Sequence, residues 1–180
     1  THGVGCAMRN DVYSYVADTQ LRSQSERNRR KMVENLGRSG MKATVQWNGD
    51  VRFSATSESG HTLKMDGPAE HGGNNVGARP MELVLIGLGG CTAFDVVHIL
   101  QKGRQDITNC GVEVSALRAD KEPKVFTDVH VQFILTGHKL NPTKVKRAID
   151  LSAQQYCSAS IMMQRGGVRF THDHEIRETP

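Results

Sequence analysis

Residues 80–91 read PMELVLIGLGGC, and this stretch decides how the rest of the chain must be arranged. Proline suits the first turn of a helix, and the following glutamate suits its positively polarised end. The spacing therefore predicts a helix that begins at Pro80 and stops near Gly103. From residue 83 to residue 100 the sequence is apolar on nearly every side. A helix of this kind is buried, so we expect the other elements to cover it.

Short strands and two further helices surround this helix in the sequence. Their predicted positions are strands at 43–47, 51–55, 62–65, 110–117, 125–135 and 168–176, and helices at 142–156 and 157–164. Asn48-Gly49 is a typical hairpin turn, and Asn141 is a typical N-cap in front of Pro142. Strands and helices therefore come in separate runs, which is typical of an α+β fold with antiparallel strands.

Charge is unevenly distributed along the 180 residues. The first 40 residues hold seven Lys/Arg and four Asp/Glu, which leaves 16 against 15 for the remainder. Met41 resembles a natural start, so we interpret 1–40 as a leader or artificial extension and 41–180 as one domain. Because the domain is close to neutral, we expect no nucleic-acid partner, and the weaker hypothesis of a basic arm at 22–31 is disfavoured.

The four cysteines are too few and too scattered for a disulfide scaffold. No secretory signal is visible in the first 30 residues, and no uncharged stretch is long enough to predict a membrane span. We therefore expect a cytoplasmic protein with reduced thiols. Cys91 lies in the apolar helix and Cys157 at the start of a later one, where a thiolate is favoured. The alternative for Cys91 is that it is a small hydrophobic residue of the core, and the same applies to Cys110 at the start of a strand.

Other polar residues are weaker candidates for a functional site than the two cysteines. Glu82 is either an ordinary charge at the start of the helix or a carboxylate of the site. Arg52 and Arg79 are the candidate cations of the site, and the alternative is that each is a solvated surface charge. His172 and His174 share one face of a predicted strand, but no third ligand with recognisable spacing accompanies them. We expect no metal and no cofactor.

PMELVL through Gly90-Cys91, with Tyr156-Cys157-Ser158 downstream, resembles the OsmC/Ohr family of osmotically inducible and organic hydroperoxide resistance proteins. The resemblance covers roughly residues 41–177 and is greatest to the YhfA-type branch, through residues 80–83 and 102–106. It implies the OsmC-like fold, in which antiparallel sheets wrap around a long central helix and two chains form an intertwined homodimer.

The resemblance also implies an activity. Cys91 would attack an organic hydroperoxide, Cys157 would resolve the sulfenic acid as a disulfide, and a dithiol would restore both. An arginine, with Arg52 as the nearest match, would keep the first cysteine ionised, and a glutamate would orient it. The peroxidase branches carry that glutamate directly after the proline, where this chain has Met81; Glu82 comes one residue later.

Two functions therefore remain open. The first is a thiol-dependent peroxidase that uses Cys91 and Cys157. The second is a dimeric protein of the same fold that binds an apolar small molecule without peroxidase activity, an alternative that the Met81 departure favours.

Overall fold

The structure is a computed structural model, and it describes residues 24, 26–28, 31–32 and 40–179. The extension predicted at 1–40 lies almost entirely outside the described residues, so the boundary at Met41 stays a prediction. The chain divides into two compact units. One contains residues 1–49 and 53–64, the other 50–52 and 65–180, and each is described by itself.

The first unit is built from the predicted strands around the hairpin. β1 (Ala43–Trp47) pairs antiparallel with β2 (Phe53–Ser57), and β3 (Thr62–Met65) lies on the other side of β2. The second strand starts two residues later than expected. The last strand pair is Trp47 with Phe53, so the turn takes up more of the chain than the two residues of the predicted hairpin, and within it Gly49 and Asp50 have positive φ values of 88° and 47°.

The Gly/Asn-rich loop that follows is organised by one buried carboxylate. Asp66 accepts backbone hydrogen bonds from Gly67, Asn74 and Val76 at 2.8–3.1 Å. These bonds, among which the one from Val76 has the largest effect, lower the pKa of Asp66 against the opposing effect of burial. The loop contains a 3-10 helix, η1 (Ala69–His71), and leads directly into the long helix.

A mixed three-stranded sheet forms the base of the second unit. β4 (Asp106–Arg118) pairs antiparallel with β5 (Phe126–His138), and β5 pairs parallel with β6 (Arg169–Glu178). The sequence correctly places all three strands, but it starts β4 four residues too late and ends β5 three residues too early. The parallel pair differs from the expected antiparallel arrangement, because the β5–β6 connection crosses through two helices instead of a tight turn.

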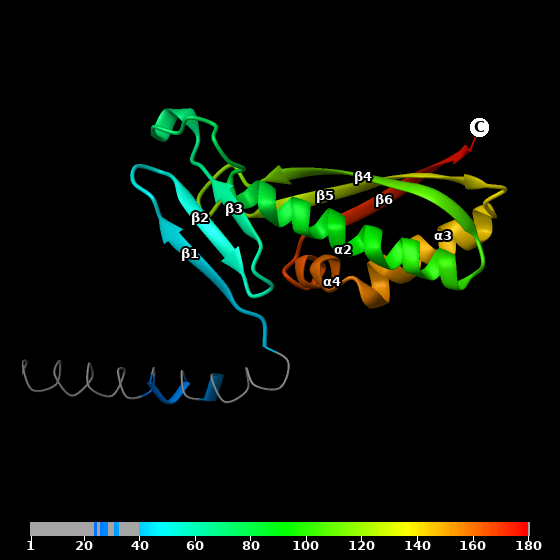
Figure 1. The fold of residues 1–180 in the computed structure, drawn as a ribbon, viewed down its shortest axis with the longest axis horizontal. Coiled ribbons are helices and arrows are strands. Elements are labelled where there is room, and N and C mark those ends of the chain that lie inside the picture. The colour runs from blue at the N-terminus through cyan, green and yellow to red at the C-terminus, as the bar shows by residue number, and fades with distance from the viewer. Residues whose placement is uncertain (1–23, 25, 29–30, 33–39, 180) are drawn as a thin grey trace, which may run out of the picture. The chain divides into compact units, whose positions relative to one another are not determined.

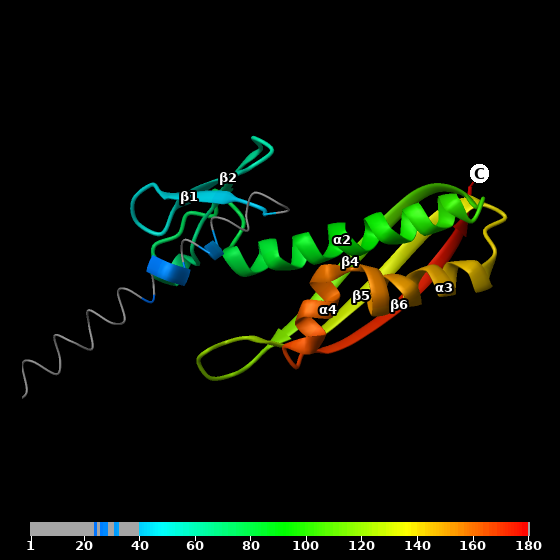
Figure 2. The same ribbon diagram turned by 90° about the horizontal axis from the view of Figure 1, so that it is seen from below.

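Helices cover one face of this sheet, as Figures 1 and 2 show from two directions. They are α2 (Pro80–Lys102), α3 (Pro142–Leu151) and α4 (Ser158–Arg165), with a π-helical turn, η2 (Ser152–Tyr156), between the last two. The Asn141 side chain caps α3 by accepting the N–H of Lys144 at 3.1 Å. α2 begins at Pro80, as predicted, and ends at Lys102, next to the predicted stop near Gly103.

The core lies between the sheet and the helices. β5 contributes Val129, Val131, Phe133 and Leu135, all almost fully buried, and α2 contributes Leu88, Thr92, Val96 and Leu100. The α2 residues recur at every fourth position, so they form one face of the helix. The expected burial of the whole helix is therefore observed on one face within this chain, while Ile86 and Phe94 on other faces are 62% and 70% exposed.

α2 is also long and apolar enough to span a membrane when judged by length and composition alone. One face of the helix packs into the core, where it contacts β4, α3 and α4. Gly89 fits this packing closely: a side-chain carbon there would lie 3.3 Å from a methyl group of Val114 on β4. Glycine at this position therefore lets the helix approach the sheet.

Candidate functional site: two thiols and a carboxylate

Two cysteines that are distant in sequence meet where α2 faces the start of α4. The ligand atoms of Cys91, Asp95 and Cys157 all lie within 4.8 Å of one another. Cys91 and Asp95 are one turn apart on α2 and therefore share a face, while Cys157 is the N-cap residue of α4. Cys91 and Asp95 are partly exposed and Cys157 is fully buried, so one thiol is reachable from outside and the other lies behind it.

The π-helical turn η2 places Cys157 in this position. The N–H of Cys157 donates to the carbonyl of Ser152, five residues earlier, at 2.9 Å. In an α-helix, residues five apart point about 140° away from each other. The wider π-helical turn instead brings Ser152 and Cys157 to a similar side of the chain, and both residues are buried. The sequence predicts an ordinary helix up to Tyr156 and misses this turn, a feature that is frequent at functional sites.

A chain of two buried hydroxyl groups leads to the carboxylate of Asp95. Ser152 Oγ donates to Asp95 Oδ2 at 3.2 Å, and Thr92 Oγ1 lies 2.9 Å from the same Ser152 Oγ. Thr92 and Ser152 are at most 2% exposed. A buried hydrogen-bonded pair has few alternative positions, so this pair restricts the rotamer of Asp95 and keeps its carboxylate beside the thiols.

The surroundings of Cys157 favour the protonated thiol. Burial is the main cause that raises its pKa, and the neighbouring Cys91 raises it further. The backbone N–H of Ser160 acts in the opposite direction, donating to Cys157 Sγ at 3.5 Å. No cationic side chain in the described part of the chain is among the groups that shift this pKa. In the described part of the chain, the side chain that lies close to both sulfurs is that of Asp95.

The other residues expected at the site lie elsewhere. Glu82 Oε2 accepts the backbone N–H of Arg79 at 2.9 Å, so both belong to the cap of α2. Glu82 precedes Cys91 by nine residues, which corresponds to about 13 Å along the helix and to its opposite side. The guanidinium of Arg52 pairs with Asp50 at 3.0 Å. Within one chain, the structure therefore brings Cys91 close to Cys157. It shows no contact of Glu82, Arg79 or Arg52 with these two cysteines.

Cys110 and the two histidines also have separate surroundings. Cys110 lies on β4 opposite Leu135, and burial raises its pKa. His172 and His174 share the inward face of β6, as predicted. His172 Nε2 lies 3.7 Å from Asp150 Oδ1, but within the described residues the three-residue group close enough to hold a metal ion contains the two cysteines and Asp95 instead.

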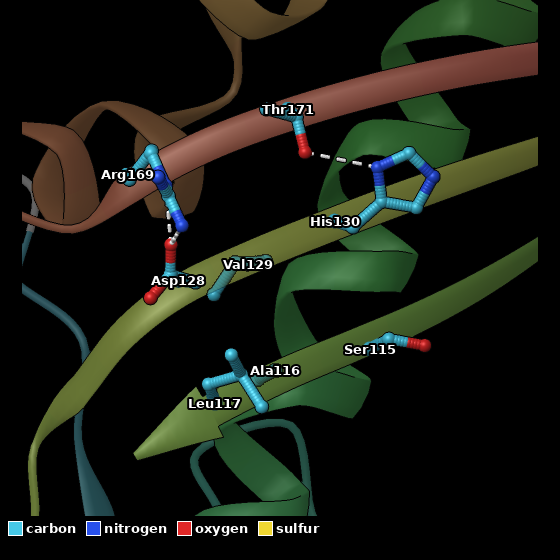
Figure 3. A pocket seen from close by; sticks show the side chains of 8 residues that line it. All are labelled: Ser115, Ala116, Leu117, Asp128, Val129, His130, Arg169 and Thr171. Atoms are coloured by element: carbon cyan, nitrogen blue, oxygen red, sulfur yellow. Dashed lines mark hydrogen bonds and ion pairs between the residues drawn. The ribbon is translucent and has the colours of Figure 1, made fainter. Parts of the chain in front are cut away.

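The outer side of the sheet carries a shallow hollow of about 370 Å³ at the end of β4, β5 and β6, and most of its exposed lining is apolar (Figure 3). Four of its polar side chains pair with each other: Arg169 with Asp128, and His130 with Thr171 at 2.9 Å. Strand alternation turns Asp128 and His130 away from the buried residues of β5 and hence away from the helices. This hollow therefore contributes nothing to the thiol site.

Asp95 is the site residue that sequence reasoning misses. A signal for it was present: Asp95 is the one Asp, Glu, Lys or Arg between Glu82 and Lys102, and it follows Cys91 by four residues. A charge in the middle of an apolar helix is costly unless it is paired or functional. With the spacing of one helical turn, it pointed to the same face as Cys91.

The chain is similar to known proteins over most of this region. The family model "OsmC-like protein" matches residues 72–173. Protein YhfA of Escherichia coli strain K12 is 43% identical over 136 residues, which cover 76% of this chain and 98% of YhfA. A solved structure from structural genomics is 41% identical, with a TM-score of 0.69, and the match covers 77% of this chain and 100% of that one.

A more distant structure shares the fold. It is an organic hydroperoxide resistance protein OsmC from Legionella pneumophila, 17% identical with a TM-score of 0.57, and the match covers 75% of this chain and 96% of that one. The matching family model, the high identity to YhfA and the shared fold lead to one conclusion: the chain belongs to the OsmC-like protein family.

Proposed function

We propose that the protein reduces organic hydroperoxides with its two cysteines. The observation that supports this most directly is the pair of sulfurs within 4.8 Å, one partly exposed and the other buried. The accessible thiol can react with a substrate, and the buried thiol lies close enough to react next with the oxidised sulfur of the first. Relatives of the same fold that are named organic hydroperoxide resistance proteins support the same choice of substrate.

The proposed reaction has three steps. The Cys91 thiolate attacks the outer oxygen of the hydroperoxide, the O–O bond breaks, and the alkoxide takes up a proton to leave as an alcohol. The sulfur becomes a sulfenic acid. Cys157 then attacks that sulfur and forms a disulfide, and the hydroxyl leaves as water after taking up the proton that Cys157 releases. A dithiol reductant finally exchanges with the disulfide and restores both thiols.

Asp95 takes a defined part in the second step of this proposal. Cys157 must lose its proton to act as a nucleophile, but burial raises its pKa. The carboxylate of Asp95 is close to both sulfurs and is oriented by Ser152. It is therefore the group available to accept the proton of Cys157 and pass it to the departing hydroxyl.

The active form in this proposal is a homodimer. Ile86 and Phe94 expose apolar side chains on α2, and Gly87 and Gly90 have open space next to them. A second copy of the chain would cover this surface and is the source from which cations such as Arg52 or Arg79 could reach Cys91. A cytoplasmic location, where thiols stay reduced, belongs to the same proposal.

A second candidate function is the binding of an apolar small molecule without peroxide chemistry. A groove of about 290 Å³ lies between α2 and β4, lined by Leu85, Ile86, Gly89, Gly90, Val112 and Val114. Its lining is apolar apart from backbone atoms. The carboxylate beside the thiols also favours this alternative, because a negative charge disfavours a thiolate nearby.

A peroxide-consumption assay separates the two candidates. Metal-free protein with a chelator present is supplied with cumene hydroperoxide and a dithiol donor. We expect wild-type protein to turn over the hydroperoxide. Cys91→Ser should abolish this turnover, Cys157→Ser should stop after the first oxidation step, and Cys110→Ser should react like the wild type. Equal rates for wild type and Cys91→Ser would reject the peroxidase and favour the binding function.

A further inference from the structure

The three side chains at the site also form a set of metal ligands. Two thiols and a carboxylate converge from α2 and from the N-cap of α4, with their ligand atoms within 4.8 Å of one another. Thiolate sulfur and carboxylate oxygen are both zinc ligands. Two sulfurs bound to one zinc ion at about 2.3 Å are about 3.8 Å apart in a tetrahedral site. Small rotations of side chains are therefore sufficient to close the three groups around an ion.

The groups behind the ligands are those that a metal site requires. Ser152 Oγ donates to one oxygen of Asp95 and is itself in contact with Thr92. A carboxylate has further lone pairs, so this hydrogen bond leaves Asp95 able to bind an ion. On the other side, the N–H of Ser160 points at Cys157 Sγ. Hydrogen bonds of this kind orient metal ligands and stabilise the charged form that binds.

We propose that Cys91, Asp95 and Cys157 bind one zinc ion in the reduced protein, with the fourth position open to water or to an external ligand. Two thiolates select zinc over magnesium and calcium, which prefer sites made of oxygen alone. The carboxylate disfavours copper(I), which prefers soft sulfur ligands. The inference does not rest on the proposed peroxidase function, since it needs no oxidant and no turnover. It departs from the expectation, drawn from the sequence, that the chain has no metal site.

The metal and the disulfide exclude each other, because both use the same two sulfurs. Bound zinc would hold the thiols in the reduced state and shield Cys91 from peroxide. Oxidation would release the ion: the two thiolates give two electrons to the hydroperoxide, which takes up two protons and becomes an alcohol and water. Zinc binding and disulfide formation would therefore compete for the same two sulfurs.

The test is a zinc titration of the full-length chain, reduced, free of oxygen and without peroxide. Competition with a chromophoric zinc chelator gives stoichiometry and affinity. We expect one zinc per chain. Cys157→Ser should abolish this binding, and Asp95→Asn should weaken it at least tenfold. Ser152→Ala should weaken it by about 10- to 100-fold, the usual effect of removing a group that orients a ligand.

Two matched variants serve as controls. Cys110→Ser removes a thiol on β4, and Asp150→Asn removes a carboxylate on α3; both should bind zinc like the wild type. X-ray absorption at the zinc edge of the wild-type protein gives an independent readout that needs no variant. It should show two sulfur ligands at about 2.3 Å and oxygen or nitrogen ligands at about 2.0–2.2 Å.

Three results would overturn the proposal. The first is wild-type binding no tighter than that of the Cys91→Ser/Cys157→Ser double variant. The second is an affinity of Asp95→Asn within twofold of wild type, which would remove the carboxylate from the site. The third is a zinc edge spectrum without sulfur. None of them bears on peroxide turnover, which is measured on metal-free protein.

Discussion

Oxidation of the site should stabilise the whole domain, and the size of the effect follows from the positions of the two cysteines. A bond between Cys91 and Cys157 closes a loop of 66 positions. Restricting an unfolded chain by such a loop is worth about 4 kcal/mol in the chain-entropy model, and measured disulfides typically give about 2–4 kcal/mol because some strain offsets the gain. The sulfurs already lie within 4.8 Å, so little rearrangement is needed.

For a domain of this size, each kcal/mol raises the Tm by about 2–4 °C. We therefore expect the oxidised protein to melt roughly 4–16 °C above the reduced protein. The measurement is scanning calorimetry on metal-free protein treated with one equivalent of cumene hydroperoxide, compared with the same sample kept in dithiothreitol. Peptide mapping of the oxidised sample should recover the 91–157 link.

Cys157→Ser is the informative control, since it keeps the peroxide-reactive Cys91 but cannot close the loop. Its Tm should not rise on oxidation, while Cys110→Ser should show the full increase. An oxidised wild-type protein with an unchanged Tm, or one linked mainly through Cys110, would refute the reasoning from the geometry of the site.

Three further predictions concern other parts of the molecule. Asp66→Asn should lower the free energy of unfolding at neutral pH. Since the pKa of Asp66 is lowered in the folded protein, the stabilisation by its carboxylate is present above about pH 4 and is lost as the pH falls through the folded pKa. Wild type and variant should therefore converge in acid denaturation curves, and a constant difference down to pH 2 would contradict this. Burial lowers the pKa of His172, so the protein should lose stability as the pH falls from about 6.5 through the folded value, and urea denaturation should show this loss removed in His172→Gln; an equal pH dependence in both proteins would be inconsistent with it. Phe94→Arg places a charge on the exposed face of α2 and should shift the mass measured by light scattering from two chains to one, whereas a wild-type protein that is already monomeric would reject the proposed dimer.

Local signals in the sequence were enough to predict most of the elements. The proline and glycine that frame α2 predicted both of its ends, and Asn141 predicted the start of α3. These signals work because helix caps and turns depend on residues that are adjacent in the chain. The two cysteines of the site could also be selected in advance, since each occupies a helical position with a recognisable environment.

The arrangement of the site depended on contacts between distant segments. The parallel pairing of β5 with β6 and the π-helical turn before Cys157 have no local signature in the sequence; the parallel pairing depends on α3 and α4, which carry the chain back to the start of β6. Contacts between distant segments also bring Asp95 to the thiols and leave Glu82 in the helix cap on the opposite side.

The sequence by itself thus determined which segments are helices and strands and which thiols stand out, because backbone propensity and hydrophobic periodicity act over a few residues. Only the tertiary structure decided that a carboxylate, and not a cation, lies beside the two sulfurs of one chain. The physical reason is that side-chain direction around a site depends on how helices are rotated against each other, and this rotation is fixed by packing of the core.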